Sequence, residues 1–196
     1  MLYYLLRFLI RPIYWLLFRP SFYRRENLNI KGKAIFVCNH VSMIDAVTLV
    51  IASRRTIHFM AKAELFNSVP GNLFFRSLLA FPVARTQADL GSVKRAMNVL
   101  HAGKIFGIFP EGKRTITNDM DAMEKGAAFL ASRSGAPIIP MYIKRDSYAK
   151  MHVVMAVGEP IRVGELVANT PKNKIVDVLT DEIGDALYAL QAEIEN

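Results

Sequence analysis

Cysteine is almost absent from this sequence of 196 residues, and other residue patterns that define whole chemical classes are missing too. Cys38 has no second cysteine to pair with, so an internal disulfide framework is excluded, and a reducing compartment fits this usage. The four histidines do not stand at metal-ligand spacing, and no glycine-rich nucleotide fingerprint occurs. Repeats and low-complexity linkers are also lacking. We therefore expect one domain without a metal or a cofactor.

The first 25 residues lack acidic side chains but hold five arginines, which supply +5 of the formal net charge of +8. The apolar run from Met1 to Phe18 is broken by Arg7, Arg11 and Pro12. A membrane span needs about 20 apolar residues, and each central arginine costs roughly 2.5–3.5 kcal/mol. A single span is therefore disfavoured. A cleaved signal peptide is disfavoured as well, because Arg19 and Pro20 stand where small residues would be needed.

The same segment fits an amphipathic helix that lies in the membrane interface. Arg7 and Arg11 are four residues apart and share a face, with Tyr3, Tyr4 and Tyr14 near the same stripe at headgroup depth. The alternative is a helix that packs on the domain's own core. We predict a membrane-docking helical segment at residues 1–25 and one folded domain at residues 26–196.

The overall composition favours a lipid surface as the partner over nucleic acid. Apolar residues make up 52% of the chain, the mean hydropathy is +0.21, and the net charge is +8. An apolar and basic chain suits an anionic membrane surface, whereas nucleic-acid binding would require basic residues interleaved with exposed aromatic residues. We predict peripheral, monotopic attachment to the cytoplasmic face of the cell membrane and no binding of nucleic acid.

Short apolar runs alternate with helical patterns along the rest of the chain. This alternation predicts an α/β domain with a mostly parallel central sheet flanked by helices. The expected strands are residues 34–38, 57–61, 80–84, 105–109, 137–143 and 152–157. The expected helices are one that follows residue 42, then 73–79 after a break at Pro70 and Gly71, 90–101, 122–134 and 175–194.

The stretch from Asn39 to Asp45 places a histidine, a hydroxyl and a carboxylate where the first of these strands ends and a helix begins. In open α/β sheets ligands bind at that edge. A purely structural interpretation also fits, in which Ser42 caps the helix and Asp45 folds back onto its first turn. Five residues do not bring His40 and Asp45 to one helix face, so their contact requires His40 to lie outside the helix. The two interpretations are compatible.

A second strand, residues 105–109, runs into Pro110, Glu111, Gly112, Lys113 and Arg114. By itself this is an ordinary surface turn with solvated charges. Two such blocks in one chain favour a joint site, in which one block offers a base and the other a cationic cradle.

Together the blocks resemble the glycerolipid acyltransferase family, specifically the 1-acylglycerol-3-phosphate (lysophosphatidate) acyltransferases. The resemblance covers roughly residues 28–161, and its four blocks occur in order at suitable intervals. Lys113 departs from the family pattern, which usually has threonine there, and this bears on acceptor preference. The matching positions are Asn39, His40, Ser42 and Asp45, then Lys62–Phe66, Pro70–Gly71 and Phe81–Arg85, then Phe109–Gly112 with Arg114, and finally Pro137–Pro140, with Lys125 and Gly126 at a further Lys-Gly pair.

The resemblance implies transfer of a fatty acyl group from acyl-CoA or acyl carrier protein to the sn-2 hydroxyl of lysophosphatidate. His40 would be the general base and Asp45 would orient it, while exposed backbone N–H groups near Ser42 could help the oxyanion. Acceptor binding would fall to Arg/Lys side chains and to Glu111, which would orient the acceptor or an arginine. The residues assigned to substrate binding are Asn39, Ser42, Lys62, Arg85, Glu111, Gly112, Lys113, Arg114 and Lys125.

Three alternatives stay open at this point. The acceptor could be glycerol 3-phosphate or another lysophospholipid. A thioesterase could use Cys38 with His40 and Asp45, although a cysteine in a buried strand usually behaves as a small hydrophobe. A non-catalytic lipid-surface protein would use only the N-terminal helix and the basic face. Residues 73–79 line an acyl tunnel or belong to the core, and the pattern favours neither.

Overall fold

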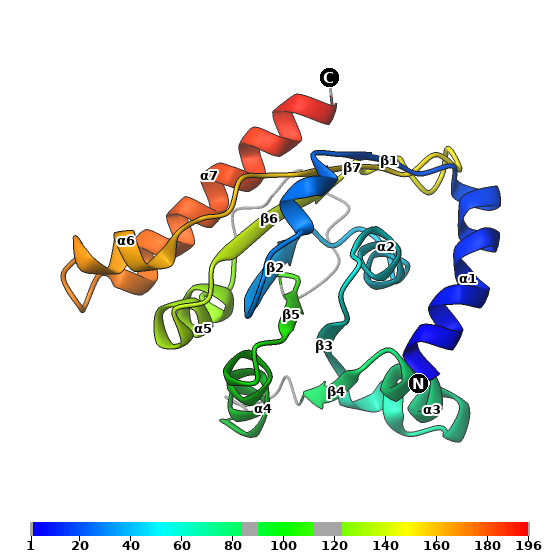
Figure 1. Ribbon diagram of the computed structural model, residues 1–196, viewed down its shortest axis with the longest axis horizontal. Coiled ribbons are helices and arrows are strands. Elements are labelled where there is room, and N and C mark those ends of the chain that lie inside the picture. The colour runs from blue at the N-terminus through cyan, green and yellow to red at the C-terminus, as the bar shows by residue number, and fades with distance from the viewer. Residues whose placement is uncertain (1, 84–89, 112–122, 196) are drawn as a thin grey trace.

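The computed structural model describes residues 2–83, 90–111 and 123–195, which form a seven-stranded sheet flanked by helices (Figure 1). The strand order is β1-β7-β6-β2-β5-β3-β4, and every adjacent pair is parallel except β6 with β7. The predicted α/β class with a mostly parallel sheet is confirmed. The elements are α1 (Leu2–Phe18), β1 (Ser21–Tyr23), η1 (Arg25–Leu28), β2 (Ala34–Cys38), α2 (Asp45–Ala52), β3 (Ile57–Lys62), η2 (Ala63–Phe66), α3 (Val69–Ser77), β4 (Ala80–Val83), α4 (Leu90–His101), β5 (Ile105–Ile108), α5 (Gly126–Ser134), β6 (Ile138–Ile143), β7 (Val154–Val157), α6 (Val163–Ala168) and α7 (Ile175–Glu195).

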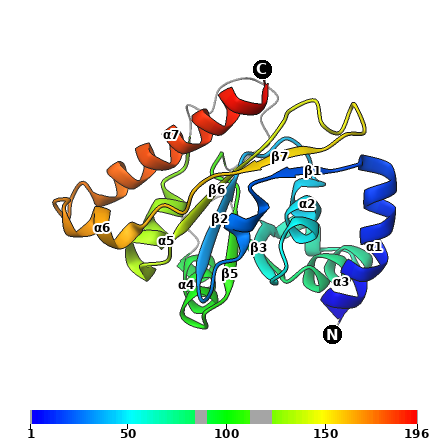
Figure 2. The same ribbon diagram turned by 45° about the horizontal axis from the view of Figure 1, so that its top comes forward.

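The core consists of two apolar layers, one on each face of the sheet. All five residues of β2 are buried because the strand is central and covered on both faces, which explains its uninterrupted apolar run. Phe36 and Cys38 point into the layer under α1 and α2, and Ile35 and Val37 point into the layer under α4, α5 and α7. Figures 1 and 2 show these two groups of helices on opposite sides of the sheet.

Several predicted element boundaries are corrected by the structure. Pro70 and Gly71 do not break a helix but lie in the first turn of α3, where the Ser68 hydroxyl accepts a hydrogen bond from the Gly71 N–H (3.2 Å). This is a position that tolerates proline. Helix α5 starts at Gly126 rather than at residue 122. Strand β1 and helix α6 escaped prediction because a three-residue edge strand and a six-residue helix carry almost no periodicity.

Helix α1 lies at one end of the molecule beside α2 and α3 (Figures 1 and 2). Its Tyr3 and Tyr14 are buried against the domain. The prediction that these two side chains lie at headgroup depth is therefore wrong. Leu6, Ile10 and Phe18 are half-buried, whereas the other large apolar side chains of the helix are exposed, among them Phe8 (74%) and Leu16 (80%). One face of α1 thus packs on the core and the other does not. None of the helices in the described ranges is both long enough and apolar enough to cross a membrane.

The N-terminal segment does not separate from the domain at residue 25. Residues 21–23 form β1, which pairs with β7 in the sheet. The helix that precedes the sheet, α1, already ends at Phe18.

Candidate active site

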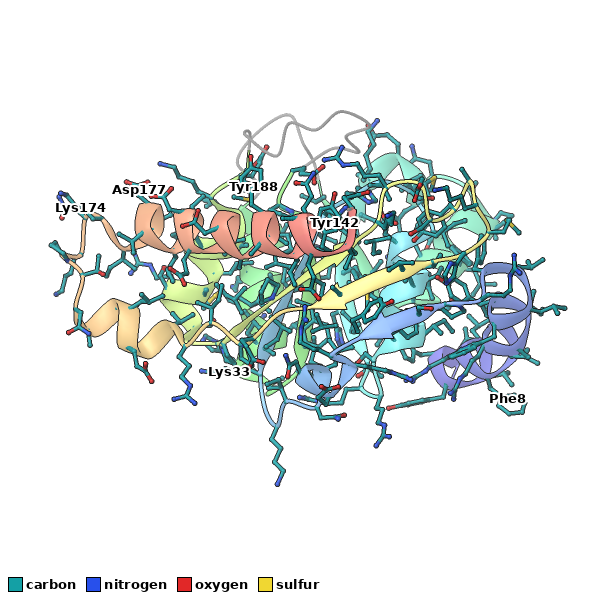
Figure 3. All side chains as sticks on the ribbon, turned by 90° about the horizontal axis from the view of Figure 1, so that it is seen from above. Phe8, Lys33, Tyr142, Lys174, Asp177 and Tyr188 are labelled. Carbon is teal, nitrogen blue, oxygen red and sulfur yellow. The ribbon has the colours of Figure 1, made fainter. Side chains whose placement is uncertain are left out.

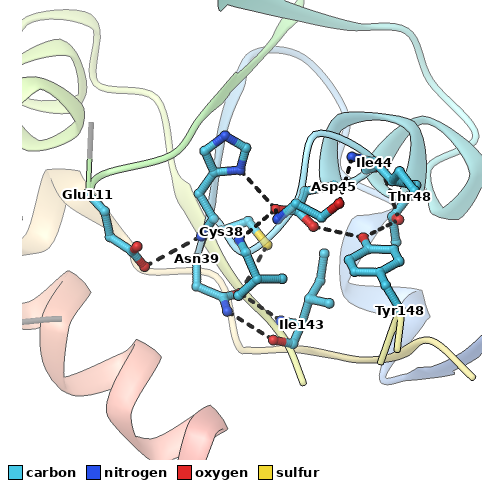
Figure 4. Close-up of polar contacts among 11 residues, drawn as sticks. Cys38, Asn39, Ile44, Asp45, Thr48, Glu111, Ile143 and Tyr148 are labelled. Carbon is cyan, nitrogen blue, oxygen red and sulfur yellow. Dashed lines mark hydrogen bonds and ion pairs between the residues drawn. The ribbon is translucent and has the colours of Figure 1, made fainter. Parts of the chain in front are cut away.

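The carboxyl ends of the parallel strands bring the separate sequence blocks to one edge of the sheet. Strand β2 leads into His40, and its neighbour β5 leads into Phe109, Pro110 and Glu111. The backbone N–H of His40 donates a hydrogen bond to Oε1 of Glu111 (3.4 Å), so the two blocks are in contact (Figure 4). This is the edge at which open α/β sheets bind ligands.

His40 and Asp45 form a hydrogen-bonded dyad. Nδ1 of His40 lies 2.8 Å from Oδ2 of Asp45, and the Asp45 side chain is fully buried while that of His40 is 18% exposed. Because Nδ1 donates to the carboxylate, the neutral ring has Nε2 as its basic nitrogen. His40 also lines the large cavity described below. This geometry suits a general base with an orienting carboxylate.

The loop from His40 to Ile44 wraps around the Asp45 carboxylate. Oδ2 accepts hydrogen bonds from the backbone N–H groups of Val41 and Ser42, both at 2.8 Å, in addition to the imidazole. The five-residue spacing therefore works through a loop and not through a shared helix face. These two N–H groups donate to the carboxylate and are not free to stabilise an oxyanion, so the expectation that they could do so is wrong for Val41 and Ser42.

Half of the predicted capping box is present. Asp45 does bond back to the N–H of Ser42, but Ser42 is not the N-cap residue of α2, which is Ile44. The Ser42 hydroxyl instead accepts from the N–H of Ile44 (3.2 Å) and closes a local turn. Ser42 therefore shapes the loop that holds Asp45.

Asn39 joins the ends of two strands. Its side-chain amide donates to the carbonyl of Ile143 (2.9 Å) and accepts from the N–H of the same residue (2.7 Å), so β2 and β6 are tied together where they end. Asn39 is 1% exposed and does not line the cavity. The predicted contact with substrate has no geometric support at this position.

A stack of aromatic rings supports the imidazole from one side. The ring of Phe109 lies parallel to that of His40 with centroids 4.2 Å apart, and Phe59 stacks behind Phe109 at 6.3 Å. The stack needs a residue without a side chain at Gly107, where a Cβ would come within 2.5 Å of the Phe59 ring. The glycine in β5 thus leaves room for the ring that backs Phe109.

Glu111 is a buried carboxyl beside the dyad. It is 7% exposed, and burial raises its pKa above the ordinary value, although the backbone N–H of His40 and the charge of Arg145 act in the opposite direction. Arg145, from the loop after β6, was not predicted as a site residue. Its position became apparent only from the sheet topology.

A cavity of about 1590 Å³ opens from the dyad into the region between the sheet edge and α2, α3, α4 and α5. This exceeds the 300–1,000 Å³ of a typical small-molecule site. Phe74, Phe75 and Leu78 of the segment that the sequence left unassigned are among its lining residues, so this segment faces the cavity. Most of the lining is apolar, which suits a hydrocarbon chain.

Two of the predicted phosphate-binding lysines lie at this cavity. Lys62 and Lys125 both line it, and each is paired with a surface carboxylate, Lys62 with Glu64 (3.2 Å) and Lys125 with Asp177 (2.5 Å). Pairs as exposed as these contribute little and can be exchanged. The other predicted binding residues, Arg85, Gly112, Lys113 and Arg114, lie outside the described residues.

Cys38 is unsuited to nucleophilic catalysis. It is completely buried in β2, and desolvation raises the pKa of its thiol well above the ordinary value, with Asp45 and Glu111 adding to the effect. A reactive cysteine needs a depressed pKa and access to substrate. In the described residues, no three His, Cys, Asp or Glu side chains are grouped so that they could hold a metal ion.

Sequence reasoning missed the residues on the far side of Asp45. The hydroxyl of Tyr148 donates to Oδ1 of Asp45 (2.7 Å) and lies 2.8 Å from the hydroxyl of Thr48 (Figure 4). Tyr148 is 103 positions away from Asp45 in the chain and belongs to no recognised motif. Only the sheet topology reveals that Tyr148 belongs here, because it brings the loop after β6 to the same edge of the sheet.

The chain is similar to known acyltransferases in sequence and in fold. The chain is 28% identical over 179 residues to the 1-acyl-sn-glycerol-3-phosphate acyltransferase of Bacillus subtilis, with 88% of each chain covered. The chloroplastic enzyme LPAT1 of Arabidopsis thaliana, which bears the same description, is 27% identical over 62% of this chain and 37% of its own. The crystal structure of the 1-acyl-sn-glycerophosphate acyltransferase PlsC from Thermotoga maritima superposes with a TM-score of 0.67 at 21% identity, covering 88% of this chain and 72% of that one. A sequence model of the Acyltransferase family matches residues 19–144, which is well over half of the chain, and the protein therefore belongs to the acyltransferase family.

Proposed function

We propose that this acyltransferase moves a fatty acyl group from an acyl thioester to the sn-2 hydroxyl of lysophosphatidate, forming phosphatidate for phospholipid synthesis. The observation that carries the proposal is the His40–Asp45 dyad, whose His40 lines a large, mostly apolar cavity. The names of the relatives support this acceptor. Acyl-CoA and acyl carrier protein are both suitable donors.

The enzyme needs only to activate the acceptor hydroxyl as a nucleophile, because the thioester is already an activated acyl donor. Nε2 of His40 takes the proton of the acceptor hydroxyl as its oxygen attacks the thioester carbonyl, and a tetrahedral intermediate forms. When this intermediate collapses, the carbon–sulfur bond breaks and the proton on His40 passes to the leaving thiolate. Asp45 holds the imidazole in the required tautomer and stabilises its charged form between the two steps.

The acceptor phosphate would be bound by cations around the cavity mouth. Lys62 and Lys125 are placed for this, since a phosphate can displace the exposed carboxylates that pair with them. Arg85, Lys113 and Arg114 remain proposed partners on the strength of the resemblance alone. Glu111, beside Arg145 and His40, would orient an arginine or the acceptor glycerol.

Membrane attachment through α1 would deliver both lipid substrates to the cavity. The exposed apolar face of the helix supplies the hydrophobic contact, and its arginines lie at the level of anionic headgroups. We place the protein as a monotopic enzyme at the cytoplasmic face of the cell membrane.

The experiment is an acyl-transfer assay with the full chain in lipid vesicles. Lysophosphatidate, glycerol 3-phosphate and a zwitterionic lysophospholipid are compared as acceptors, each with acyl-CoA and with acyl carrier protein as donor. We expect phosphatidate from lysophosphatidate as the fastest product. A higher kcat/KM for glycerol 3-phosphate or the zwitterionic acceptor would overturn the proposed acceptor.

His40→Ala should lower kcat by about 10²–10⁴-fold, which is the usual contribution of a general base. His101→Ala is the matched control, because His101 is exposed at the end of α4 and its loss should leave the rate unchanged. Cys38→Ala should retain transfer, whereas a thioesterase that uses this thiol would lose activity. Normal turnover by folded His40→Ala protein would refute the mechanism.

A further inference from the structure

A chain of buried hydroxyl groups connects α1 to the catalytic dyad. The hydroxyl of Tyr14, on the buried face of α1, lies 2.7 Å from the hydroxyl of Thr48 in α2. Thr48 lies 2.8 Å from Tyr148, and Tyr148 donates to Oδ1 of Asp45 at 2.7 Å. Asp45 in turn holds His40. Four short hydrogen bonds thus run from the helix with the exposed apolar face to the imidazole.

The number of hydroxyl hydrogens decides which group donates in each of these hydrogen bonds. Tyr148 has one hydroxyl hydrogen, and it is directed at the Asp45 carboxylate, which can only accept. The Thr48 hydroxyl has two acceptors within reach, the hydroxyl of Tyr148 at 2.8 Å and the carbonyl oxygen of Ile44 at 3.2 Å. The shorter contact with Tyr148 holds a hydrogen only if Thr48 donates to Tyr148, and Tyr14 then donates to Thr48. In this order all three hydroxyls point toward the carboxylate, and hydrogen bonds aligned in this way strengthen one another.

Both tyrosines stay protonated, as the chain requires. Burial raises the pKa of Tyr14 to about 12. Burial, reinforced by the negative charge of Asp45, raises the pKa of Tyr148 well above its ordinary value. Thr48 is completely buried, so no water competes for its hydroxyl.

Helix α1 also touches Tyr148 through a second route. The ring of Phe18, at the end of α1, meets the ring of Tyr148 edge-on with centroids 5.7 Å apart, and Tyr14 packs against Phe18 at 5.0 Å. The hydroxyl and the ring of Tyr148 are therefore both restrained by α1. A displacement of the helix would release the residue that fixes the far oxygen of Asp45.

We propose that Tyr14 and Tyr148 are positioning residues for the dyad, and that through them the seating of α1 on α2 sets the orientation of Asp45 and hence of His40. In this arrangement the helix that attaches the enzyme to a lipid surface also completes its active site. The inference rests on the proposed role of His40 as general base, but not on the identity of the acceptor.

The test compares conservative variants that each remove one hydroxyl. Tyr148→Phe should lower kcat about tenfold, as expected for a lost hydrogen bond to a charged group, and Tyr14→Phe about threefold, with KM for both substrates unchanged. Tyr3→Phe is the matched control. Tyr3 is buried on the same face of α1, but its hydroxyl accepts from the N–H of Ile57 (3.4 Å) and does not touch the chain. It should stay within about twofold of the wild type, as the loss of a bond outside the chain predicts.

A double variant tests whether Tyr14 and Tyr148 act in series or independently of each other. If Tyr14 acts only through Tyr148, Tyr14→Phe/Tyr148→Phe should be no slower than Tyr148→Phe alone. Thr48→Ser, which keeps the hydroxyl, should restore the rate that Thr48→Val loses. Equal losses in Tyr3→Phe and Tyr14→Phe, or additive losses in the double variant, would overturn the proposal.

A spectroscopic measurement keeps this test separate from the proposed function. In proteins with ¹⁵N-labelled histidine, NMR should show His40 as the Nδ1–H tautomer in the wild type and a tautomer mixture in Tyr148→Phe, with no change in Tyr3→Phe. An unchanged tautomer in Tyr148→Phe would refute the positioning role even in an active enzyme. If the wild type acylates no acceptor, yet the His40 tautomer still changes in Tyr148→Phe, the proposed function would be refuted and the positioning role of Tyr148 would be retained.

Discussion

Glu111 is a single buried carboxyl beside the dyad whose burial affects the stability of the fold. Burial raises the pKa of its carboxyl above the ordinary value, more strongly than Arg145 and the His40 N–H lower it. Between the two pKa values the folded protein binds more protons than the unfolded chain, so stability falls as the pH rises through this range. Above the raised pKa the charged carboxylate is a constant cost to folding. Below the ordinary value this cost is absent.

Glu111→Gln should therefore stabilise the protein at neutral pH. The amide keeps an oxygen that can accept from the His40 N–H but carries no charge. We expect the melting temperature to rise by about 2–4 °C at pH 7.5, which corresponds to about 1 kcal/mol, and the difference to vanish near pH 4. Thermal unfolding at the two pH values checks this, with Glu182→Gln on the exposed surface of α7 as control. A less stable Gln variant at pH 7.5 would contradict the sign of the effect.

The residues of the dyad were predictable because a strand end followed by a loop is a local pattern. The stretch from Asn39 to Asp45 singled out His40 and Asp45, the second block and the resemblance assigned their roles, and the structure joins them. The role of Asn39 was not predictable, because its partner Ile143 is 104 positions away. Tyr148 and Arg145 were missed for the same reason. The local loop holds Oδ2 of Asp45, but the contact of Oδ1 with Tyr148 depends on strand order, which no short stretch of sequence reveals.

At the scale of a single element, helix α1 has one face packed on the domain and another that is exposed. Tyr3 and Tyr14 fix one face to the domain, while the guanidinium of Arg7 donates to the carbonyl of Arg54 (3.1 Å). Phe8 points away from the molecule on the other face (Figure 3). The two hypotheses drawn from the sequence, an interfacial helix and a helix packed on the core, thus describe different faces of the same element.

Phe8→Asp should weaken binding to lipid vesicles by about tenfold or more, since a fully buried side chain of this size contributes roughly 1.5–3 kcal/mol. The exposed position predicts little effect on folding. Leu90→Asp is the matched control, because Leu90 is 78% exposed on α4, away from α1 (Figure 1). Vesicle sedimentation of both variants, with thermal unfolding in parallel, gives the comparison. Equal binding by the two variants would show that the apolar face of α1 is not the contact.

Charge is distributed unevenly over the whole molecule. Helix α7 has no basic residue and carries six acidic ones, whereas the first 25 residues have five arginines and no acid. Figure 3 shows Phe8 of α1 and Lys174, just before α7, at opposite ends of the molecule. Arg25 lies so close to Arg7, Arg11 and Arg54 that, after the effect of burial, their charges lower its pKa further. The molecule therefore presents a basic end that adjoins an exposed apolar helix face.

Binding to anionic vesicles should accordingly depend on where the positive charges lie and not on their number. Each arginine near the surface contributes about 1 kcal/mol, so Arg7→Gln/Arg11→Gln should lower the affinity by roughly thirtyfold and reduce its dependence on salt. Lys172→Gln/Lys174→Gln removes the same charge from exposed residues at the opposite end and should change neither property. The measurement is partitioning to vesicles with and without an anionic lipid at low and high salt. If the two double variants lose affinity equally, net charge alone steers the protein, and α1 has no defined orientation on the membrane. If only the first does, the basic end meets the lipid first, and the hydroxyl chain from Tyr14 to Asp45 begins at the point of contact.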